Sequence, residues 1–167
     1  MMEAARGAEG CPVPAGKTEV TPSAHEFREF DAKRLSRRLS AVIAADTAAI
    51  SLFTDQVMLL LQENDGAEAK GFDIEMALRE ALANAVLHGC KSDPGKRVEC
   101  TVACEDGGGI LIIVRDPGAG FDPLSVQSPL VAENILSDHG RGIFLMNMLM
   151  DEVRWERGGT EIHLRKK

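Results

Sequence analysis

The sequence has little of several features that mark specialised classes of protein. It contains no tyrosine and one tryptophan, and aromatic residues make up only 4% of its 167 residues. No apolar run reaches the roughly 18 residues that a membrane-spanning helix needs, and no apolar segment follows a basic start as in a secretory signal. The four cysteines form neither a disulfide framework nor a Cys-x-x-Cys pair. We therefore expect a protein of the reducing cytoplasm that makes no contact with a membrane.

Positive charge is also scarce. The 26 acidic residues outnumber the 19 lysines and arginines and give a formal net charge of -7. Proteins that bind nucleic acids usually present a basic surface, so we expect no direct nucleic-acid partner. With 44% hydrophobic and 27% charged residues, the composition is typical of a single globular domain.

The chain divides into an irregular start and a patterned remainder. Residues 1–30 are rich in glycine, alanine, proline and glutamate and lack sustained periodicity, which predicts a flexible N-terminal arm. Residues 31–167 form the predicted domain. Its predicted elements are, in order, a strand (35–45), two helices (46–63 and 73–89), two strands (97–105 and 110–115), an irregular stretch (116–139), a helix (142–150) and two strands (152–156 and 160–164). This order predicts an α/β (α+β) two-layer sandwich, with a mixed, mostly antiparallel sheet and helices on one face.

Local signals support several of these elements. Asp46 or Thr47 is placed to cap the first helix, and Asp73 and Gly89 to begin and end the second. The segment 106–109 (DGGG) between two strand patterns predicts a hairpin.

Two of the cysteines fall in an alternating pattern. Val98, Cys100, Val102 and Cys104 would share one face of a strand. A free cysteine packs as a small hydrophobic residue, so we expect core thiols rather than a metal or redox site.

Two short motifs resemble known phosphate chemistry but lack its context. Gly16 to Thr18 (GKT) resembles the end of a P-loop, yet Cys11 stands where that loop needs its first glycine. His25 to Arg28 (HEFR) resembles the phospho-acceptor box of sensor histidine kinases. Such kinases have two long dimerisation helices after this box, and here a strand and a helix of the domain itself fill the interval. We therefore expect His25 to be an ordinary residue of the arm.

The second predicted helix carries a polar stripe. Glu80, Asn84 and His88 are spaced i, i+4, i+8 and so share one side of the helix. A carboxylate and a carboxamide one turn apart can coordinate Mg²⁺ through oxygen and orient a water or hydroxyl group. The same spacing also occurs on an ordinary solvated helix face.

Three glycine-containing segments follow in the second half of the chain. Asp116 to Asp122 (DPGAGFD) comes directly after a buried strand, where an acidic side chain can accept a hydrogen bond from a base edge or simply form a turn. His139 to Ile143 (HGRGI) precedes a predicted helix, whose exposed N–H groups favour anions. The segment 158–160 (GGT) opens the last strand with a hydroxyl group.

Taken together, these pieces resemble the Bergerat-fold ATPases, the GHKL superfamily. Residues 80–89 (EALANAVLHG) look like the N box, 116–122 like the first glycine box, 140–146 (GRGIFLM) like the second, and 159–164 (GTEIHL) like the terminal strand motif. The resemblance runs from about Leu35 to Arg165. Within the superfamily, Glu80 before Asn84, the segment 145–153 (LMNMLMDEV) and the short lid at 123–139 are similar to the bacterial anti-sigma-factor serine kinases.

The resemblance implies roles for individual residues. Asn84 would bind Mg²⁺ between the phosphates of ATP, and Glu80 would act as general base. Asp116 would accept from the adenine amine, supported by Thr160 through water. Gly118 and Gly120 would shape the adenine pocket, and Gly140 and Gly142 would hinge the lid and contact phosphates. The remaining predicted nucleotide contacts are His88, Arg141 and Ile143.

The resemblance also implies a function and partners. A dimeric, cytoplasmic, ATP-dependent serine/threonine kinase would hold a sigma factor and phosphorylate a STAS-type anti-anti-sigma protein. A non-catalytic ATP-binding module that regulates another signalling protein is the alternative. A histidine-kinase remnant, phosphorylated on His25, is a third. Measurable transfer of phosphate to serine separates the first from the other two.

Overall fold

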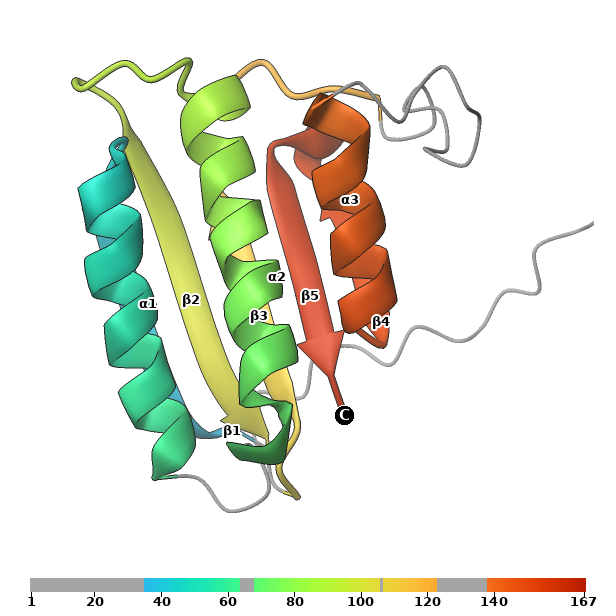
Figure 1. The fold of residues 1–167 in the computed structure, drawn as a ribbon. Coiled ribbons are helices and arrows are strands. Elements are labelled where there is room, and N and C mark those ends of the chain that lie inside the picture. Colours follow the sequence, from blue (N-terminus) through green and yellow to red (C-terminus); the bar gives the residue numbers. More distant parts are fainter. Residues whose placement is uncertain (1–34, 64–67, 106, 123–137) are drawn as a thin grey trace, which may run out of the picture. The chain divides into compact units, whose positions relative to one another are not determined.

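The computed structural model describes residues 35–63, 68–105, 107–122 and 138–167 (Figure 1). The predicted arm at 1–30 and the predicted lid, apart from its last two residues, lie outside these ranges. The elements are β1 (Leu35–Ala44), α1 (Thr47–Gln62), the 3₁₀ turn η2 (Glu68–Lys70), α2 (Gly71–Asn84), the π-helical turn η3 (Ala85–Gly89), β2 (Arg97–Glu105), β3 (Ile110–Arg115), α3 (Asp138–Leu149), β4 (Glu152–Glu156), the 3₁₀ turn η5 (Arg157–Gly159) and β5 (Glu161–Lys166). This order confirms the predicted one. None of the helices in the described ranges is long and apolar enough to cross a membrane.

The sheet has the strand order β1-β2-β3-β5-β4. Each neighbouring pair is antiparallel, so the described sheet has no parallel pair where a mixed sheet was predicted. Figure 1 shows α1, α2 and α3 in one layer on the same side of the sheet, which confirms the two-layer sandwich. The apolar strand β3 is central, with β2 on one side and β5 on the other, because both of its faces are hydrophobic.

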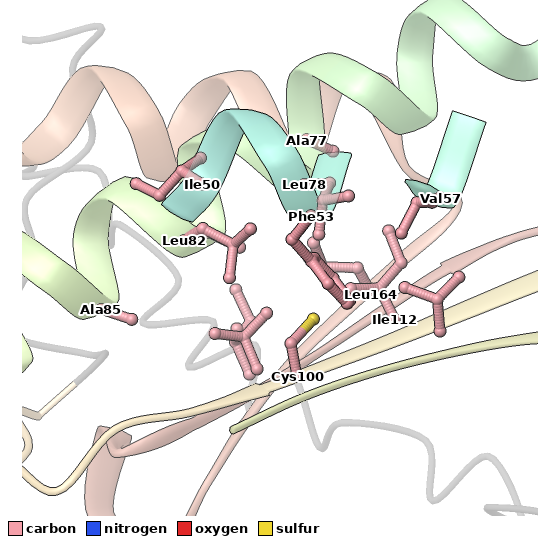
Figure 2. Packing of buried hydrophobic residues seen from close by; sticks show 14 of the residues in the cluster. Ile50, Phe53, Val57, Ala77, Leu78, Leu82, Ala85, Cys100, Ile112 and Leu164 are labelled. Carbon is pink, nitrogen blue, oxygen red and sulfur yellow. The ribbon is translucent and has the colours of Figure 1, made fainter. Parts of the chain in front are cut away.

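The core lies between the helical layer and the sheet. Figure 2 shows Ile50, Phe53 and Val57 of α1 with Leu78 and Leu82 of α2, above the strands. The strand residues that meet them include Cys100, Ile112 and Leu164. Cys100 and Cys104 are both buried, and burial raises the pKa of each thiol, so both stay protonated. The prediction of core thiols is confirmed.

The helix starts follow the predicted signals in one case and not in the other. Asp46 caps α1, and its Oδ1 accepts a hydrogen bond of 2.7 Å from the backbone N–H of Ala49. The prediction that Asp73 caps α2 is wrong: the cap position is Lys70, which makes no side-chain cap bond. The turn η2 leads directly into α2, so the helix begins earlier, and Asp73 lies in its first turn with Oδ2 2.8 Å from Lys166 Nζ.

Two boundaries near the candidate site also differ from the prediction. The helical segment ends at Gly89 as predicted, but its last turn is a π-helix in which the Cys90 N–H donates to the Ala85 carbonyl, 2.7 Å away. The third helix begins at Asp138 rather than Gly142, so Gly140 and Gly142 are helical and residues 138–139 are not irregular. Glycine has a low helix propensity, so the glycines of this segment favoured the prediction of a later helix start.

Candidate functional site

A cavity of about 370 Å³ opens where the end of α2, the end of β3 and the β4–β5 turn come together. This volume lies within the range of small-molecule binding sites. Its lining residues are Ala81, Asn84, Ala85, His88, Gly89, Lys91, Val114, Asp116, Ala119, Gly120, Phe121, Ile143, Trp155, Gly159, Thr160 and Ile162. Most of these are apolar or glycine, and a few polar groups converge among them, as in a site for a flat organic ring with a polar edge.

The structure brings together most, but not all, of the predicted site residues. The predicted residues that line the cavity are Asn84, His88, Asp116, Gly120, Ile143 and Thr160. Glu80, Gly118 and Gly142 are not among the lining residues. The Gly118 N–H donates to the Asp116 carboxylate, and Glu80 lies one turn from Asn84 on α2. Gly140 and Arg141 lie in the first turn of α3, and Arg141 is exposed and is not among the described lining residues. Their predicted phosphate contacts therefore stay predictions.

Asp116 is the acidic group of the cavity. It follows the last residue of β3 and is half-buried. The Gly118 N–H donates to its Oδ1 at 2.7 Å, whereas its Oδ2 makes no hydrogen bond with any described residue. Burial raises the pKa of the Asp116 carboxyl, against the opposing effects of the Gly118 hydrogen bond and the Lys96 charge. One oxygen thus fixes the side chain and the other is available as an acceptor.

Glycines allow the backbone to close around this carboxylate. A Cβ on Gly118 would lie 2.6 Å from Asp116 Oδ1, and a Cβ on Gly89 would overlap the same carboxylate. Gly120 has φ 75° and its missing Cβ would overlap the Gly158 carbonyl. That carbonyl accepts a hydrogen bond of 3.0 Å from the N–H of Phe121. The loop after β3 is therefore held against the β4–β5 turn.

The backbone of Thr160 is hydrogen-bonded to the backbone of Asp116. The Asp116 N–H donates to the Thr160 carbonyl at 3.0 Å. The Thr160 hydroxyl donates to the Arg157 carbonyl at 3.1 Å. Since its one proton is used in this bond, the hydroxyl can act toward a ligand or water only as an acceptor.

Glu80 and Asn84 occupy neighbouring turns of α2, against α3. Both side chains are half-buried, and neither makes a hydrogen bond or ion pair with the part of the chain that the structure describes. A Cβ on Gly142 of α3 would lie 2.5 Å from Glu80 Oε2 and 3.4 Å from Asn84 Nδ2. Gly142 therefore gives these two polar groups room where the helices pack together. Half-buried oxygen atoms without a protein partner are suited to bind a divalent cation and a reacting hydroxyl group.

Among the lining residues that were not predicted as site residues, three have large or charged side chains: Phe121, Trp155 and Lys91. The rings of Phe121 and Trp155 meet edge to face, with centroids 4.8 Å apart and planes at 75°. They give the cavity an aromatic part, although one is in a glycine-rich loop and the other on an edge strand. Lys91 lines the cavity just beyond η3. Gly158 and Gly159, three and four residues after Trp155, indicated a close approach of the backbone, but nothing in the sequence pattern indicated Lys91.

Comparisons with known proteins agree with this geometry. Residues 43–166 match the family described as histidine kinase-like ATPase domain. An anti-sigma F factor of Geobacillus stearothermophilus is 34% identical over 99 residues, which cover 56% of this chain and 67% of that protein. A serine-protein kinase RsbW of Bacillus subtilis is 37% identical over 89 residues, which cover 49% of this chain and 54% of that protein.

A solved structure supports the fold. The crystal structure of the RsbU and RsbW domains of a Mycobacterium tuberculosis protein superimposes with a TM-score of 0.54 at 22% identity. The match covers 79% of this chain and 32% of that one. At this level of identity the likeness concerns the fold alone.

Proposed function

The chain belongs to the histidine kinase-like ATPase (GHKL) family and is related to the anti-sigma kinases, and we propose that it is an ATP-dependent serine/threonine kinase of the anti-sigma type. The observation that carries this proposal is that Asp116 and Asn84 line one cavity and that Glu80 lies one turn from Asn84 on α2. This arrangement would provide an acceptor for the adenine base, an oxygen ligand for a metal and a carboxylate that acts as general base. These are the parts that phosphoryl transfer needs.

The base of ATP would lie at the Asp116 end of the cavity. The adenine amine would donate to the Oδ2 of Asp116, because Oδ1 is already bonded to the Gly118 N–H. The rings of Phe121 and Trp155 would shield the base from water, and Thr160 would accept a hydrogen bond from a bridging water. Burial in an apolar site strengthens such a hydrogen bond.

The phosphates would lie toward Asn84 and Glu80. Mg²⁺ prefers oxygen ligands, and the half-buried carboxamide of Asn84 has no partner among the described residues, so its oxygen fits this ion. When bound, Mg²⁺ neutralises charge on the phosphates. The Glu80 carboxylate would accept the proton of the attacking serine hydroxyl group, and the γ-phosphoryl group would pass from ATP to that oxygen.

The partners would be proteins. The names of the relatives lead us to propose a sigma factor as one partner and a STAS-type anti-anti-sigma protein as the serine substrate. The sigma factor would be held by a homodimer of this chain. With a net charge of -7, the surface would repel a phosphorylated antagonist, so the unphosphorylated form would bind more tightly.

Mixing experiments test this proposal. The protein is combined with ATP or ADP, a sigma factor and a STAS-type antagonist of its own organism, and the complexes are sized. We expect a complex of two copies with the sigma factor, competition by the antagonist, and phosphoserine on the antagonist by mass spectrometry in the presence of ATP. An antagonist whose serine is replaced by alanine is the control. ATP binding without phosphoserine would contradict the kinase and favour the non-catalytic regulatory module.

Gly142→Ala is expected to impair transfer through Glu80. The new Cβ would force the Glu80 carboxylate away from its position, and misplacement of a catalytic group by about 1 Å can cost on the order of a hundredfold in rate. We expect transfer to fall about ten- to a hundredfold, while thermal stability is kept because alanine favours a helix. In single-turnover assays, combining Gly142→Ala with Glu80→Gln should cost little more than Glu80→Gln alone. A large loss of nucleotide affinity in Gly142→Ala would instead indicate direct phosphate contact.

A further inference from the structure

The β4–β5 hairpin carries three side chains of the metal-ligating type on one face of the sheet. Along β5, Glu161 and His163 alternate with Ile162 and Leu164, which are buried in the core. Successive residues of a strand point to opposite faces, so Glu161 and His163 point away from the core. Glu156 of β4 is the cross-strand partner of Glu161 and shares its face. Because Ile162 lines the cavity, the three side chains lie on the face of the sheet opposite to it.

The ligand atoms of these side chains lie close together. The Nε2 atom of His163 is 2.8 Å from Oε1 of Glu161 and 4.0 Å from Oε2 of Glu156. All three ligand atoms lie within 4.8 Å of one another, and no other group of this kind occurs in the described ranges. Zn²⁺ binds such atoms at about 2.0–2.2 Å, which in a tetrahedral arrangement places them about 3.4 Å apart. Small side-chain rotations bring the three atoms to that spacing.

The charges of the hairpin also favour a cation at this place. Two carboxylates on directly opposite residues of neighbouring strands repel each other. Arg157 compensates one of them, with its Nε 2.9 Å from Oε2 of Glu161. The ion pair that the described residues offer Glu156 is the one with His163, which exists only while the imidazole is protonated. The Glu161 side chain is only 12% exposed, so water screens this repulsion weakly.

We propose that Glu156, Glu161 and His163 form a binding site for Zn²⁺. One imidazole and two carboxylates are a ligand set that suits Zn²⁺, whereas Mg²⁺ prefers oxygen ligands alone. Arg157 would orient Glu161 through Oε2 while Oε1 binds the ion, as the outer partners of metal ligands do. Glu156 is exposed, so water would complete the coordination. This site does not depend on the proposed function, because it lies outside the cavity.

A bound ion would fasten the two ends of the hairpin turn. Glu156 precedes the turn η5, and Glu161 begins the strand that follows it. An ion held by both carboxylates would bridge β4 and β5 at the point where they diverge into this turn. A ligand that binds only the folded chain stabilises it, so Zn²⁺ should raise the midpoint of thermal unfolding.

Calorimetry with Zn²⁺ on the full chain, free of any affinity tag, nucleotide and Mg²⁺, tests the site. Loss of an outer partner of a metal ligand costs about 10- to 100-fold in affinity, so loss of a ligand should cost at least about tenfold. We expect that loss in Glu156→Gln and in His163→Gln. Glu152→Gln is the matched control, because Glu152 lies on the same face of β4 and pairs with Arg154 and Lys167 instead. It should bind Zn²⁺ as the wild type does.

Thermal unfolding provides the second readout and shows that each variant folds. Zn²⁺ should raise the midpoint in the wild type and in Glu152→Gln but not in Glu156→Gln or His163→Gln. No binding of Zn²⁺ to the wild type, or wild-type affinity in both ligand variants, would overturn the inference. His88→Gln should keep its affinity for Zn²⁺. If binding were lost in that variant instead, the ion would lie in the cavity that His88 lines, and the inference would be wrong.

Discussion

Glu80→Gln is expected to abolish most phosphoryl transfer while ATP still binds. The substitution keeps the size of the side chain and removes its ability to accept a proton. General-base catalysis contributes about 100- to 10,000-fold, and we expect a loss in that range. The fold should be unaffected, because the Glu80 carboxylate makes no hydrogen bond or ion pair with the residues that the structure describes.

A single-turnover assay with a cognate serine-bearing antagonist measures this effect. Glu75→Gln is the matched control, because Glu75 lies on the same helix and pairs with Arg79, 2.9 Å away, on the helix surface. The control should transfer phosphate at the wild-type rate. If Glu80→Gln transferred phosphate at the wild-type rate, Glu80 would have no catalytic role.

Substitutions at Asn84 and Asp116 are expected to weaken ATP binding. Asn84→Ala removes the proposed ligand of Mg²⁺, and Asp116→Asn replaces the acceptor for the adenine amine by a group that can also donate. A hydrogen bond to a charged group contributes about 1.5–3 kcal/mol, so each variant should lose about ten- to a hundredfold in affinity. Calorimetry with ATP and Mg²⁺ measures the loss, and wild-type affinity in both variants would contradict the nucleotide assignment.

Asp116→Asn should also stabilise the folded protein. Burial raises the pKa of Asp116, so the ionised carboxylate is less favourable in the folded chain than in the unfolded chain. The stability that this group contributes is therefore greatest below its unfolded-state pKa and is lost as pH rises through the folded-state pKa. At neutral pH the neutral amide avoids this loss and raises the midpoint of thermal unfolding.

Asp93→Asn is the matched control for both effects. Asp93 accepts a hydrogen bond from the N–H of Gly95, two residues on, at 2.9 Å, just as Asp116 does from Gly118. It is exposed, however, and lies outside the cavity. Its substitution should leave nucleotide affinity and the midpoint of thermal unfolding near wild type, because the asparagine oxygen can accept the same hydrogen bond. If Asp116→Asn lowered the midpoint of thermal unfolding at neutral pH, burial of the ionised Asp116 carboxylate would not be destabilising the folded protein.

Much of the fold could be predicted because its signals are local. The alternation of Val98 to Cys104, the apolar run of β3 and the cap at Asp46 each depend on neighbours in sequence, and each prediction is confirmed. The sequence pattern did not predict the π-helical turn or the start of α3 at Asp138. The close packing of Gly142 against Glu80 joins two helices, and a sequence pattern does not contain that contact.

The candidate site was predictable to a similar degree. The spacing along one helix and the position after a buried strand singled out Asn84 and Asp116 as candidates, and both line the cavity. Trp155 and Lys91 reach the cavity from an edge strand and from the turn after η3, and no sequence motif marked either segment as ligand-binding. Their places depend on how the β4–β5 turn and the turn after η3 fold back toward α2, and helix and strand periodicity do not record that geometry.

A crystal structure with Mg²⁺ and a non-hydrolysable ATP analogue would test the central claim most directly. We predict that the adenine amine lies within hydrogen-bond distance of Asp116 Oδ2, that the Asn84 side-chain oxygen coordinates Mg²⁺, and that the terminal phosphate faces Glu80. A nucleotide bound elsewhere, or one whose base lies away from Asp116 with its metal held by other residues, would contradict the account.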